Sequence, residues 1–296
     1  MLAKARLAYE IAAHPINRTR PGSAVWRYLS WNIGRRLVDT SFVMPLADDV
    51  SIMLSNEENY ATLAYTERLW DFEDMMFLVH LLRPGDLFVD IGANVGAYSL
   101  LASGVAGATS IAFEPVPRTY ERLVANIRLN DLVELVEVHN AGLAEREGML
   151  RFTSTLGGLN HVVEGATDRP TVEVPVRRLE DVLGERVPLI AKLDVEGYEK
   201  SVLAGAGDLL SAPGLTAIIC ELNGSGERYG VSDEELDGII QSHGFCPFGY
   251  DPEVRLLKQR TAFRSAGLNT LYLRDGDSVR ERLAVADRVK VGGRSF

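Results

Sequence analysis

The stretch LFVDIGANVGAYSLL, residues 87–101, places an acidic residue and two glycines where a strand would give way to a helix. Asp90 lies inside an apolar run, and Gly92 and Gly96 follow it at a spacing of four. A run that is apolar on both faces is typical of a parallel strand covered by helices on each side. The strand end, the glycine turn and the helix start together predict a niche for a small polar or anionic ligand.

The glycine spacing decides which ligand this niche suits. Dinucleotide sites use G-x-G-x-x-G, whose middle glycine lets a pyrophosphate approach bare backbone. Here the three positions are Gly92, Asn94 and Ala97, so the Asn94 side chain stands where the pyrophosphate would lie. The sequence therefore favours a smaller ligand over a nicotinamide or flavin dinucleotide.

Two further acidic positions fall at predicted strand ends. Glu114 closes the run TSIAFEP about 20 residues after the glycine turn, where a carboxylate accepts hydrogen bonds from both ribose hydroxyls. Asp194 closes PLIAKLD at the edge where α/β sheets place ligands, and Glu196 and Gly197 follow it. An acidic pair before a helix also caps that helix and interacts with its dipole, so the residue types leave both roles open.

These motifs together resemble one family. FVDIGANVGAYSLL, FEPVPRTYERLVANI and KLDVEGYEKSVLAG occur in this order, and the chain is similar over residues 70–275 to the FkbM family of S-adenosylmethionine-dependent methyltransferases. The resemblance implies O-methylation of a hydroxyl group, foremost on a sugar of a glycolipid, polysaccharide or glycosylated natural product, or else on a polyketide. It implies S-adenosylmethionine as cofactor and S-adenosylhomocysteine as product.

The resemblance also implies places for individual residues around the cofactor. The implied contacts are Asp90, Gly92, Ala93, Asn94 and Gly96 at the methionine end, Glu114 with Pro115 at the ribose, Asn140 and Ala141 beside adenine, Asp194 near the amino group and the transferring methyl, and Tyr65 and Glu73 ahead of the first strand.

Methyl transfer to an alcohol gains from a base within hydrogen-bond reach of the acceptor hydroxyl. The candidate catalytic bases are Asp194, Glu196 and His161, in that order of expected nearness to the cofactor. His161 has the most suitable unperturbed pKa, although a histidine in a glycine-rich insert is commonly a solvated loop residue. A divalent cation held by Asp194, Glu196 and a third oxygen ligand is an alternative that the sequence does not complete.

The order of elements predicts a doubly wound α/β fold of the class I, Rossmann-like methyltransferase type, with a mostly parallel sheet and a late antiparallel strand. We expect an N-terminal helical and hairpin extension at 1–69, carrying a basic arm and an acceptor-side cap, and a methyltransferase domain at 70–296. The expected helices are 70–82, 96–104, 117–130, 198–208 and 232–241; the expected strands are 87–91, 109–115, 132–138, 188–194, 215–222 and 269–274, with an inserted strand pair at 147–154 and 171–177.

Composition bounds the compartment and the partners. The net charge of −10 argues against general nucleic-acid binding, and no apolar run approaches the length of a membrane span. The two cysteines, Cys220 and Cys246, match no zinc or redox spacing and are expected to be core thiols. We therefore expect a cytoplasmic protein that acts on a small-molecule or glycan acceptor.

The N-terminal arm differs in charge from the rest of the chain. Residues 1–40 hold seven basic and two acidic residues, which leaves a net charge of −15 on residues 41–296. Trp26, Tyr28 and Trp31 alternate with arginines, as in segments that lie at membrane interfaces. Two interpretations stay open: peripheral contact with an anionic membrane or an anionic head group of the acceptor, or packing on the acidic body of the same chain or of a second copy in a homodimer.

Three other function classes compete with an O-methyltransferase. One is a nicotinamide-dependent oxidoreductase, which Asn94 disfavours. Another is a binding module that holds S-adenosylmethionine without turnover. The third is a methyltransferase whose acceptor is the nitrogen of an amine or amide.

Overall fold

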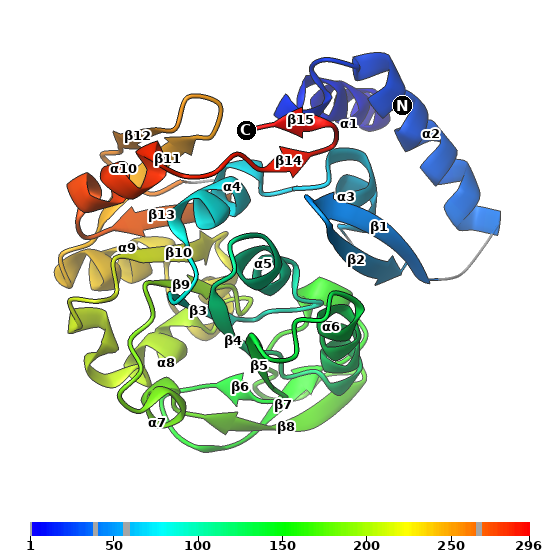
Figure 1. The fold of residues 1–296 in the computed structure, drawn as a ribbon. Coiled ribbons are helices and arrows are strands. Elements are labelled where there is room, and N and C mark those ends of the chain that lie inside the picture. The colour runs from blue at the N-terminus through cyan, green and yellow to red at the C-terminus, as the bar shows by residue number, and fades with distance from the viewer. Residues whose placement is uncertain (1, 38–40, 56–59, 265–267) are drawn as a thin grey trace.

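The computed structural model describes residues 2–37, 41–55, 60–264 and 268–296 (Figure 1). Within these ranges, the largest sheet has eight strands in the order β12-β11-β13-β10-β9-β3-β4-β5. Its parallel part consists of β3 (Leu87–Ile91), β4 (Thr109–Phe113), β5 (Val136–His139), β9 (Ile190–Leu193) and β10 (Ala217–Leu222). The antiparallel part consists of β13 (Leu268–Leu273), β11 (Cys246–Asp251) and β12 (Leu256–Gln259). The expected mostly parallel sheet with a late antiparallel strand is confirmed, and β11 and β12 extend it beyond the prediction.

Helices cover both faces of the sheet because its central strands are apolar on both sides. In β3, Phe88 belongs to the core on one face, whereas Val89 and Ile91 belong to the core on the other. The first face carries α4 (Phe72–Leu81), α5 (Ala97–Leu100), α6 (Pro117–Leu129) and α10 (Gly276–Ala284). The second face carries α7 (Leu179–Leu183), α8 (Glu199–Ala204) and α9 (Asp233–Ser242).

Three predicted elements differ from the observed ones. The helix expected at 96–104 is α5 followed by a π-helical turn over Leu101–Val105, and the helix expected at 198–208 is α8 followed by a 3₁₀ turn over Gly207–Ser211. The strand expected at 132–138 begins only at Val136. Its first residues form a turn instead, in which the Leu132 carbonyl accepts hydrogen bonds from the amides of Leu135 and Val136.

The insert between β5 and β9 forms a small separate sheet. The predicted strand pair is confirmed as the antiparallel strands β7 (Gly148–Thr153) and β8 (Thr171–Arg177). A two-residue strand, β6 (Gly142–Leu143), pairs with β8 and was not predicted because two residues carry no periodicity. Phe152 and Val162 of the insert are buried, so the insert has an apolar face of its own.

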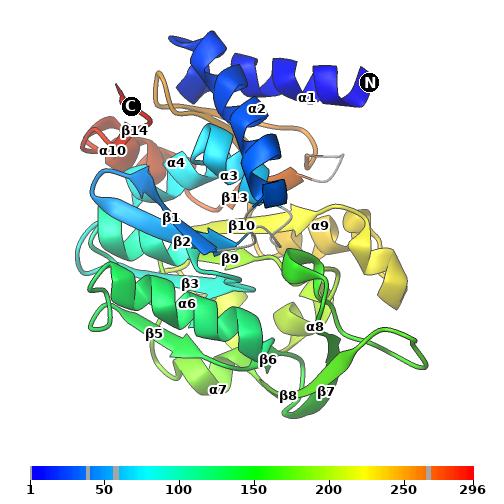
Figure 2. The same ribbon diagram turned by 90° about the vertical axis from the view of Figure 1, so that its right-hand side faces the viewer.

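The N-terminal extension consists of α1 (Leu2–Ala13), α2 (Pro21–Leu37), the hairpin of β1 (Ser41–Ala47) and β2 (Val50–Ser55), and α3 (Ala61–Glu67). In Figure 2, α1 and α2 lie outside the layers of the main sheet, next to α3. The hairpin is fastened to α6, since the side-chain oxygens of Asn126 and Asn130 accept hydrogen bonds from the amides of Met53 and Ser51. Among the helices of the described ranges, none is long and apolar enough to cross a membrane.

Candidate active site

The turn after β3 brings the carboxyl ends of β3 and β9 into direct contact. Gly92 has a φ of +81°, and a Cβ added to it would lie 1.8 Å from the carbonyl oxygen of Asp194. Asn94, two residues on, also has a positive φ of +53°. Gly96 caps α5 with a φ of +94°, and its missing Cβ leaves room for Leu123 of α6. Only glycine fits at Gly92, because both the backbone conformation and the neighbouring carbonyl exclude a side chain.

Asp90 anchors the start of α5 through hydrogen bonds and does not line either of the two cavities near this turn. It is 1% exposed, and its Oδ2 accepts hydrogen bonds from the amide of Ser99 at 3.1 Å and from the Ser99 hydroxyl at 2.7 Å. Burial raises the pKa of the Asp90 carboxyl, while the nearby Lys192 opposes the rise. The expectation that Asp90 borders the methionine end is thus corrected: its contacts fix the start of α5.

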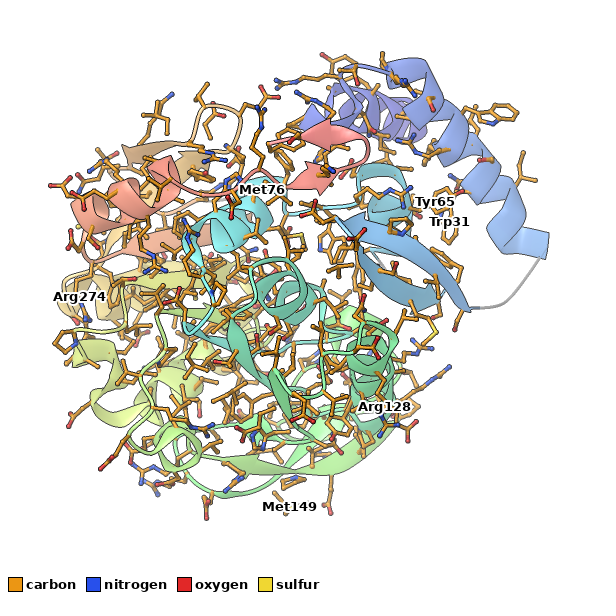
Figure 3. All side chains as sticks on the ribbon, in the orientation of Figure 1. Trp31, Tyr65, Met76, Arg128, Met149 and Arg274 are labelled. Atoms are coloured by element: carbon orange, nitrogen blue, oxygen red, sulfur yellow. The ribbon has the colours of Figure 1, made fainter. Side chains whose placement is uncertain are left out.

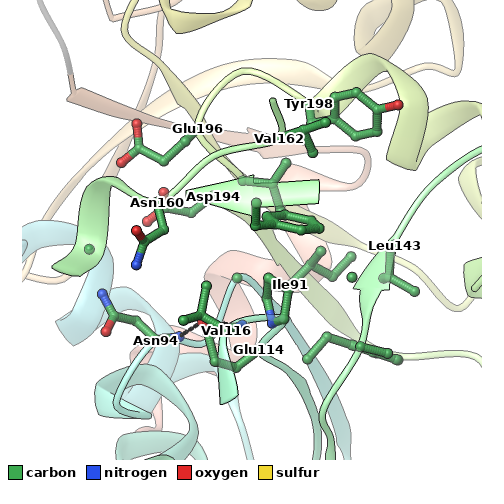
Figure 4. A pocket seen from close by; sticks show the side chains of 18 of the residues that line it. Ile91, Asn94, Glu114, Val116, Leu143, Asn160, Val162, Asp194, Glu196 and Tyr198 are labelled. Carbon is green, nitrogen blue, oxygen red and sulfur yellow. Dashed lines mark hydrogen bonds between the residues drawn. The ribbon is translucent and has the colours of Figure 1, made fainter. Parts of the chain in front are cut away.

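Glu114 is the acidic residue at the end of β4, and it faces the first cavity. Its Oε2 accepts from the amide of Asn94 at 3.1 Å and its Oε1 accepts from the amide of Val116 at 2.9 Å (Figure 4). Burial raises the pKa of Glu114 to about 7. A carboxylate has about four acceptor positions, so two remain for the hydroxyls of a ligand.

The first cavity lies between the strand ends and the insert. The ends of β3 and β4 and the residues after β5 form one side, and the insert forms the other, as Figure 4 shows with Val162 and Asn160. The predicted cofactor residues in its lining are Gly92, Asn94, Glu114, Pro115, Ala141 and Asp194. Asn140 is not in the lining; its side-chain amide donates to the carbonyls of Glu114 and Pro115 and so shapes the end of β4.

A second cavity adjoins the first and shares Gly92, Asn94, Gly158, Asp194 and Glu196 with it. Its remaining walls come from the extension, from the residues just before α4, from the turn after β3 and α5, from β9 and β10, and from Leu159 of the insert. The residues that only this cavity contacts include Ala93, Tyr60, Leu63, Trp70, Asp71, Tyr98, Lys192 and Glu221. The rings of Tyr60 and Trp70 are stacked, with centroids 4.9 Å apart, and the Tyr60 hydroxyl donates to the side-chain oxygen of Asn94.

Three carboxyl groups converge where the two cavities meet. Oxygens of Asp194, Glu196 and Glu221 all lie within 4.8 Å of one another. The parallel register explains this meeting, because Cys220 of β10 pairs with Leu193 of β9 and the next residue of each strand is acidic. Carboxylate oxygens are also the ligands that Mg²⁺ and Ca²⁺ prefer, so the donor set suits a hard cation.

The three carboxyl groups differ in their partners. The Nζ of Lys192, whose side chain is buried, lies 2.7 Å from Asp194 Oδ2 and 4.8 Å from the centre of the Tyr98 ring. Burial and the charge of Asp194 raise the pKa of Glu196 to about 7. Burial, Asp194 and Glu196 raise the pKa of Glu221 to about 9, and its Oε2 is buried without a hydrogen-bond partner. Glu221 is therefore the carboxyl group most ready to hold a proton.

Gly96 and three further predicted site residues, His161, Tyr65 and Glu73, lie outside both cavity linings. The His161 backbone pairs with Thr153, and its Nδ1 lies 3.0 Å from the carbonyl oxygen of Leu159, so one of its two ring nitrogens already has a partner. Tyr65 stacks on Trp31 at 4.9 Å, and Glu73 pairs with Arg264 at 3.1 Å. The expectations for these three residues are corrected accordingly: the His161 ring contacts a carbonyl of its own loop, and the side chains of Tyr65 and Glu73 contact other elements of the protein.

The structure instead contributes five residues that the sequence analysis missed: Tyr60, Trp70, Asp71, Lys192 and Glu221. Lys192 and Glu221 lie inside apolar strand sequences, where a charged residue is unusual, and that contrast was an available signal. The other three residues, Tyr60, Trp70 and Asp71, precede β3, and nothing in their spacing indicates that they line the same cavity.

Comparison with known proteins places this site in a family. The family model described as the methyltransferase FkbM domain matches residues 90–246, which include both strand ends and the converging carboxylates. "Methyltransferase 1" of Beauveria bassiana is 34% identical over 152 residues, covering 42% of this chain and 60% of its own length. "31-O-demethyl-FK506 methyltransferase FkbM" of Streptomyces tacrolimicus is 30% identical over 210 residues, covering 59% and 78%. "Hexuronic acid methyltransferase AglP" of Haloferax volcanii is 26% identical over 174 residues, covering 55% and 71%. The chain thus spans three fifths of the Beauveria protein.

Proposed function

The chain belongs to the FkbM family of S-adenosylmethionine-dependent methyltransferases, and we propose that it methylates a hydroxyl group, foremost that of a sugar in a glycolipid, polysaccharide or glycosylated natural product. One observation carries this proposal: two adjoining cavities meet at Asp194 and Glu196. A methyl donor in one cavity and an acceptor in the other would have their reacting atoms at that boundary. Two of the relatives are named for 31-O-demethyl-FK506 and for a hexuronic acid.

The residues of the first cavity fit the nucleoside half of S-adenosylmethionine. Glu114 has free acceptor capacity for the ribose hydroxyls, and Ala141, Phe152 and Val162 offer apolar surface to a flat base. Gly92, which lines both cavities, has no side chain, so a ligand can approach the backbone closely there. When bound, the cofactor supplies a methyl group on a positively charged sulfur, which keeps the electron pair of the broken bond and leaves as neutral S-adenosylhomocysteine.

The second cavity has walls that suit a sugar ring. The stacked pair Tyr60 and Trp70 presents aromatic surface to the C–H face of a ring, while carboxylates on the other side accept hydrogen bonds from hydroxyl groups. A polyketide hydroxyl would use the same aromatic surface with fewer polar contacts. An amine acceptor would gain from the negative charge of the carboxylates.

Glu221 is the base that these contacts favour. Asp194 is ion-paired with Lys192, whereas Oε2 of Glu221 is buried with no hydrogen-bond partner. The raised pKa makes the ionised form of Glu221 the strongest base of the three carboxylates. In that form it takes the proton of the acceptor hydroxyl as the new O–C bond forms, and solvent later removes this proton. The contact with Lys192 holds the Asp194 carboxyl group at the boundary of the cavities.

The test measures S-adenosylhomocysteine release and acceptor mass with sugar, polyketide and amine acceptors, each with Mg²⁺ and with a chelator. We expect a 14-Da gain on a hydroxylated sugar, and no loss with chelator. Glu221→Gln should lower kcat about 10² to 10⁴-fold while the KM for S-adenosylmethionine stays unchanged. The matched control is Glu147→Gln, at an exposed loop position.

Four results would overturn parts of the proposal. Cofactor binding without turnover on any acceptor would indicate a binding module. Methylation of amines alone would replace the hydroxyl acceptor. Unchanged kcat in Glu221→Gln would return the base role to Glu196 or Asp194, and loss of activity with chelator would assign the three carboxylates to a cation.

A further inference from the structure

Helix α2 packs on the protein through one face only. Trp31 is buried, its Nε1 donates to the hydroxyl of Thr62 at 2.9 Å, and its ring stacks on Tyr65, as the labelled side chains of Figure 3 show. Tyr28, one turn earlier, is also buried and packs against α1. Arg27 donates to the carbonyl of Thr66 at 3.1 Å. These contacts fix the rotation of α2 about its axis.

The opposite face of α2 exposes large apolar side chains. Trp26 is 70% exposed, Leu29 is 49% exposed and Ile33 is 64% exposed. Their spacing of three and then four residues places them in one row along the helix, which we name the α2 strip. Such a row on a helix whose other face is already packed marks a surface for a partner rather than part of the core.

The segment that carries the α2 strip is basic. Between residues 11 and 38 the chain has five arginines and no acidic residue, although the net charge of the whole chain is −10. Arg20, just before the helix, is exposed, and Arg18 is 57% exposed where it pairs with Glu253. Arg35 and Arg36 follow Ile33 in the sequence. A partner must therefore offer apolar contact and negative charge together.

We propose that the α2 strip docks on the surface of an anionic lipid bilayer, with α2 lying in the plane of the interface. An anionic bilayer supplies both requirements, because the indole and aliphatic side chains enter the headgroup boundary while the arginines pair with lipid phosphates. The acidic body of a second copy would attract the arginines but would cover Trp26 and Ile33 with charged groups, which is unfavourable.

Docking through α2 would also orient the second cavity. Thr62, which holds Trp31, belongs to α3, and Leu63 of the same helix lines that cavity together with Tyr60. A bilayer under α2 would thus lie near the wall that we assign to the acceptor, as a lipid-linked acceptor requires. This orientation rests on the proposed function, whereas the docking itself does not.

The test is co-sedimentation of the full chain with vesicles of phosphatidylcholine alone and of phosphatidylcholine with phosphatidylglycerol. We expect binding to the anionic vesicles that weakens as NaCl rises from about 0.1 to about 0.5 M, because salt screens the arginines. The double variant Trp26→Gln/Ile33→Gln should bind at least tenfold more weakly. The matched control, Val254→Gln/Val285→Gln, removes two apolar side chains that are 67% and 76% exposed elsewhere and should bind like the unmodified chain.

Two results would overturn the proposal. One is equal binding, or none, to the two kinds of vesicle. The other is a dimer in light scattering that Trp26→Gln/Ile33→Gln converts to a monomer without any vesicle binding, which would assign the α2 strip to a second copy. Circular dichroism of each variant verifies that it is folded. None of these measurements uses methyl transfer, so they stand apart from the test of the proposed function.

Discussion

Replacing Gly92 by alanine tests whether the contact between β3 and β9 builds the site. The new Cβ would lie 1.8 Å from the Asp194 carbonyl oxygen and 2.8 Å from its carbon. Real Cβ atoms essentially never approach closer than 3.0 Å, so one of the two backbones must move by about 1 Å or more. The same movement strains the hydrogen bonds from Gly92 N to Phe113 O and from Asp194 N to Ile91 O.

The size of the effect follows from two separate costs. A positive φ costs a residue with a side chain about 1–2 kcal/mol, and overpacking against fixed atoms costs about 1–3 kcal/mol more. The matched control is Gly85→Ala, because Gly85 has a φ of +93° but a Cβ added to it would meet nothing within 4 Å. We therefore expect Gly85→Ala to lose about 1–2 kcal/mol of unfolding free energy and Gly92→Ala to lose about 2–5 kcal/mol.

The functional effect should exceed the effect on stability. Gly92 and Asp194 line both cavities, and a shift of about 1 Å in a catalytic position can cost about 10²-fold in rate. Urea denaturation measures the unfolding free energies, and calorimetry with S-adenosylhomocysteine measures binding. If Gly92→Ala matched Gly85→Ala in both stability and affinity, the contact between the two strand ends would not build the site.

Three further predictions concern charge. Glu114→Gln should weaken S-adenosylhomocysteine binding by about 2 kcal/mol at pH 8. Only the unmodified chain should lose affinity as the pH falls through 7, where Glu114 gains a proton. Parallel pH profiles of the two proteins in calorimetry would contradict the ribose assignment. Lys192→Met should lower the unfolding free energy by about 2–3 kcal/mol because it leaves the charge of Asp194 unpaired. Adding Asp194→Asn should recover part of this loss. Additive losses in the double-mutant cycle would show that the two residues are not coupled. The protein should lose stability from pH 5 to pH 7, because five buried or half-buried carboxyl groups with pKa values of about 7 keep protons that the unfolded chain releases above about pH 4.5. They outnumber the two buried or half-buried histidines, whose pKa values of about 4 act in the opposite sense. A rise in stability over this range in urea denaturation would contradict the assignment. These carboxyl groups are Glu67, Asp74, Glu114, Glu196 and Glu199, and the histidines are His14 and His80.

Apolar patterning alone was enough to predict the sheet and one end of the site. Runs such as LFVDI and LIAKL are apolar on both faces, and only a strand between two helical layers buries both faces. The parallel strands and their succession along the chain were therefore predictable. The strand end also located Glu114, because a residue directly after a buried strand must emerge at the carboxyl edge. β11 and β12 carry no such signal, since they are short, partly exposed and interrupted by Pro247 and Gly249.

Which side chains meet in the site depends on packing between distant parts of the chain. Glu221 and Asp194 lie 27 positions apart in the sequence, and the register of β9 with β10 makes them neighbours. Tyr65 and His161 were placed wrongly because a motif fixes where a backbone runs, whereas packing against Trp31 or a bond to a nearby carbonyl decides where the side chain points. Local patterns specify strands and turns; contacts across the sheet depend on the strand order, which buries each side chain against residues that are distant in the chain.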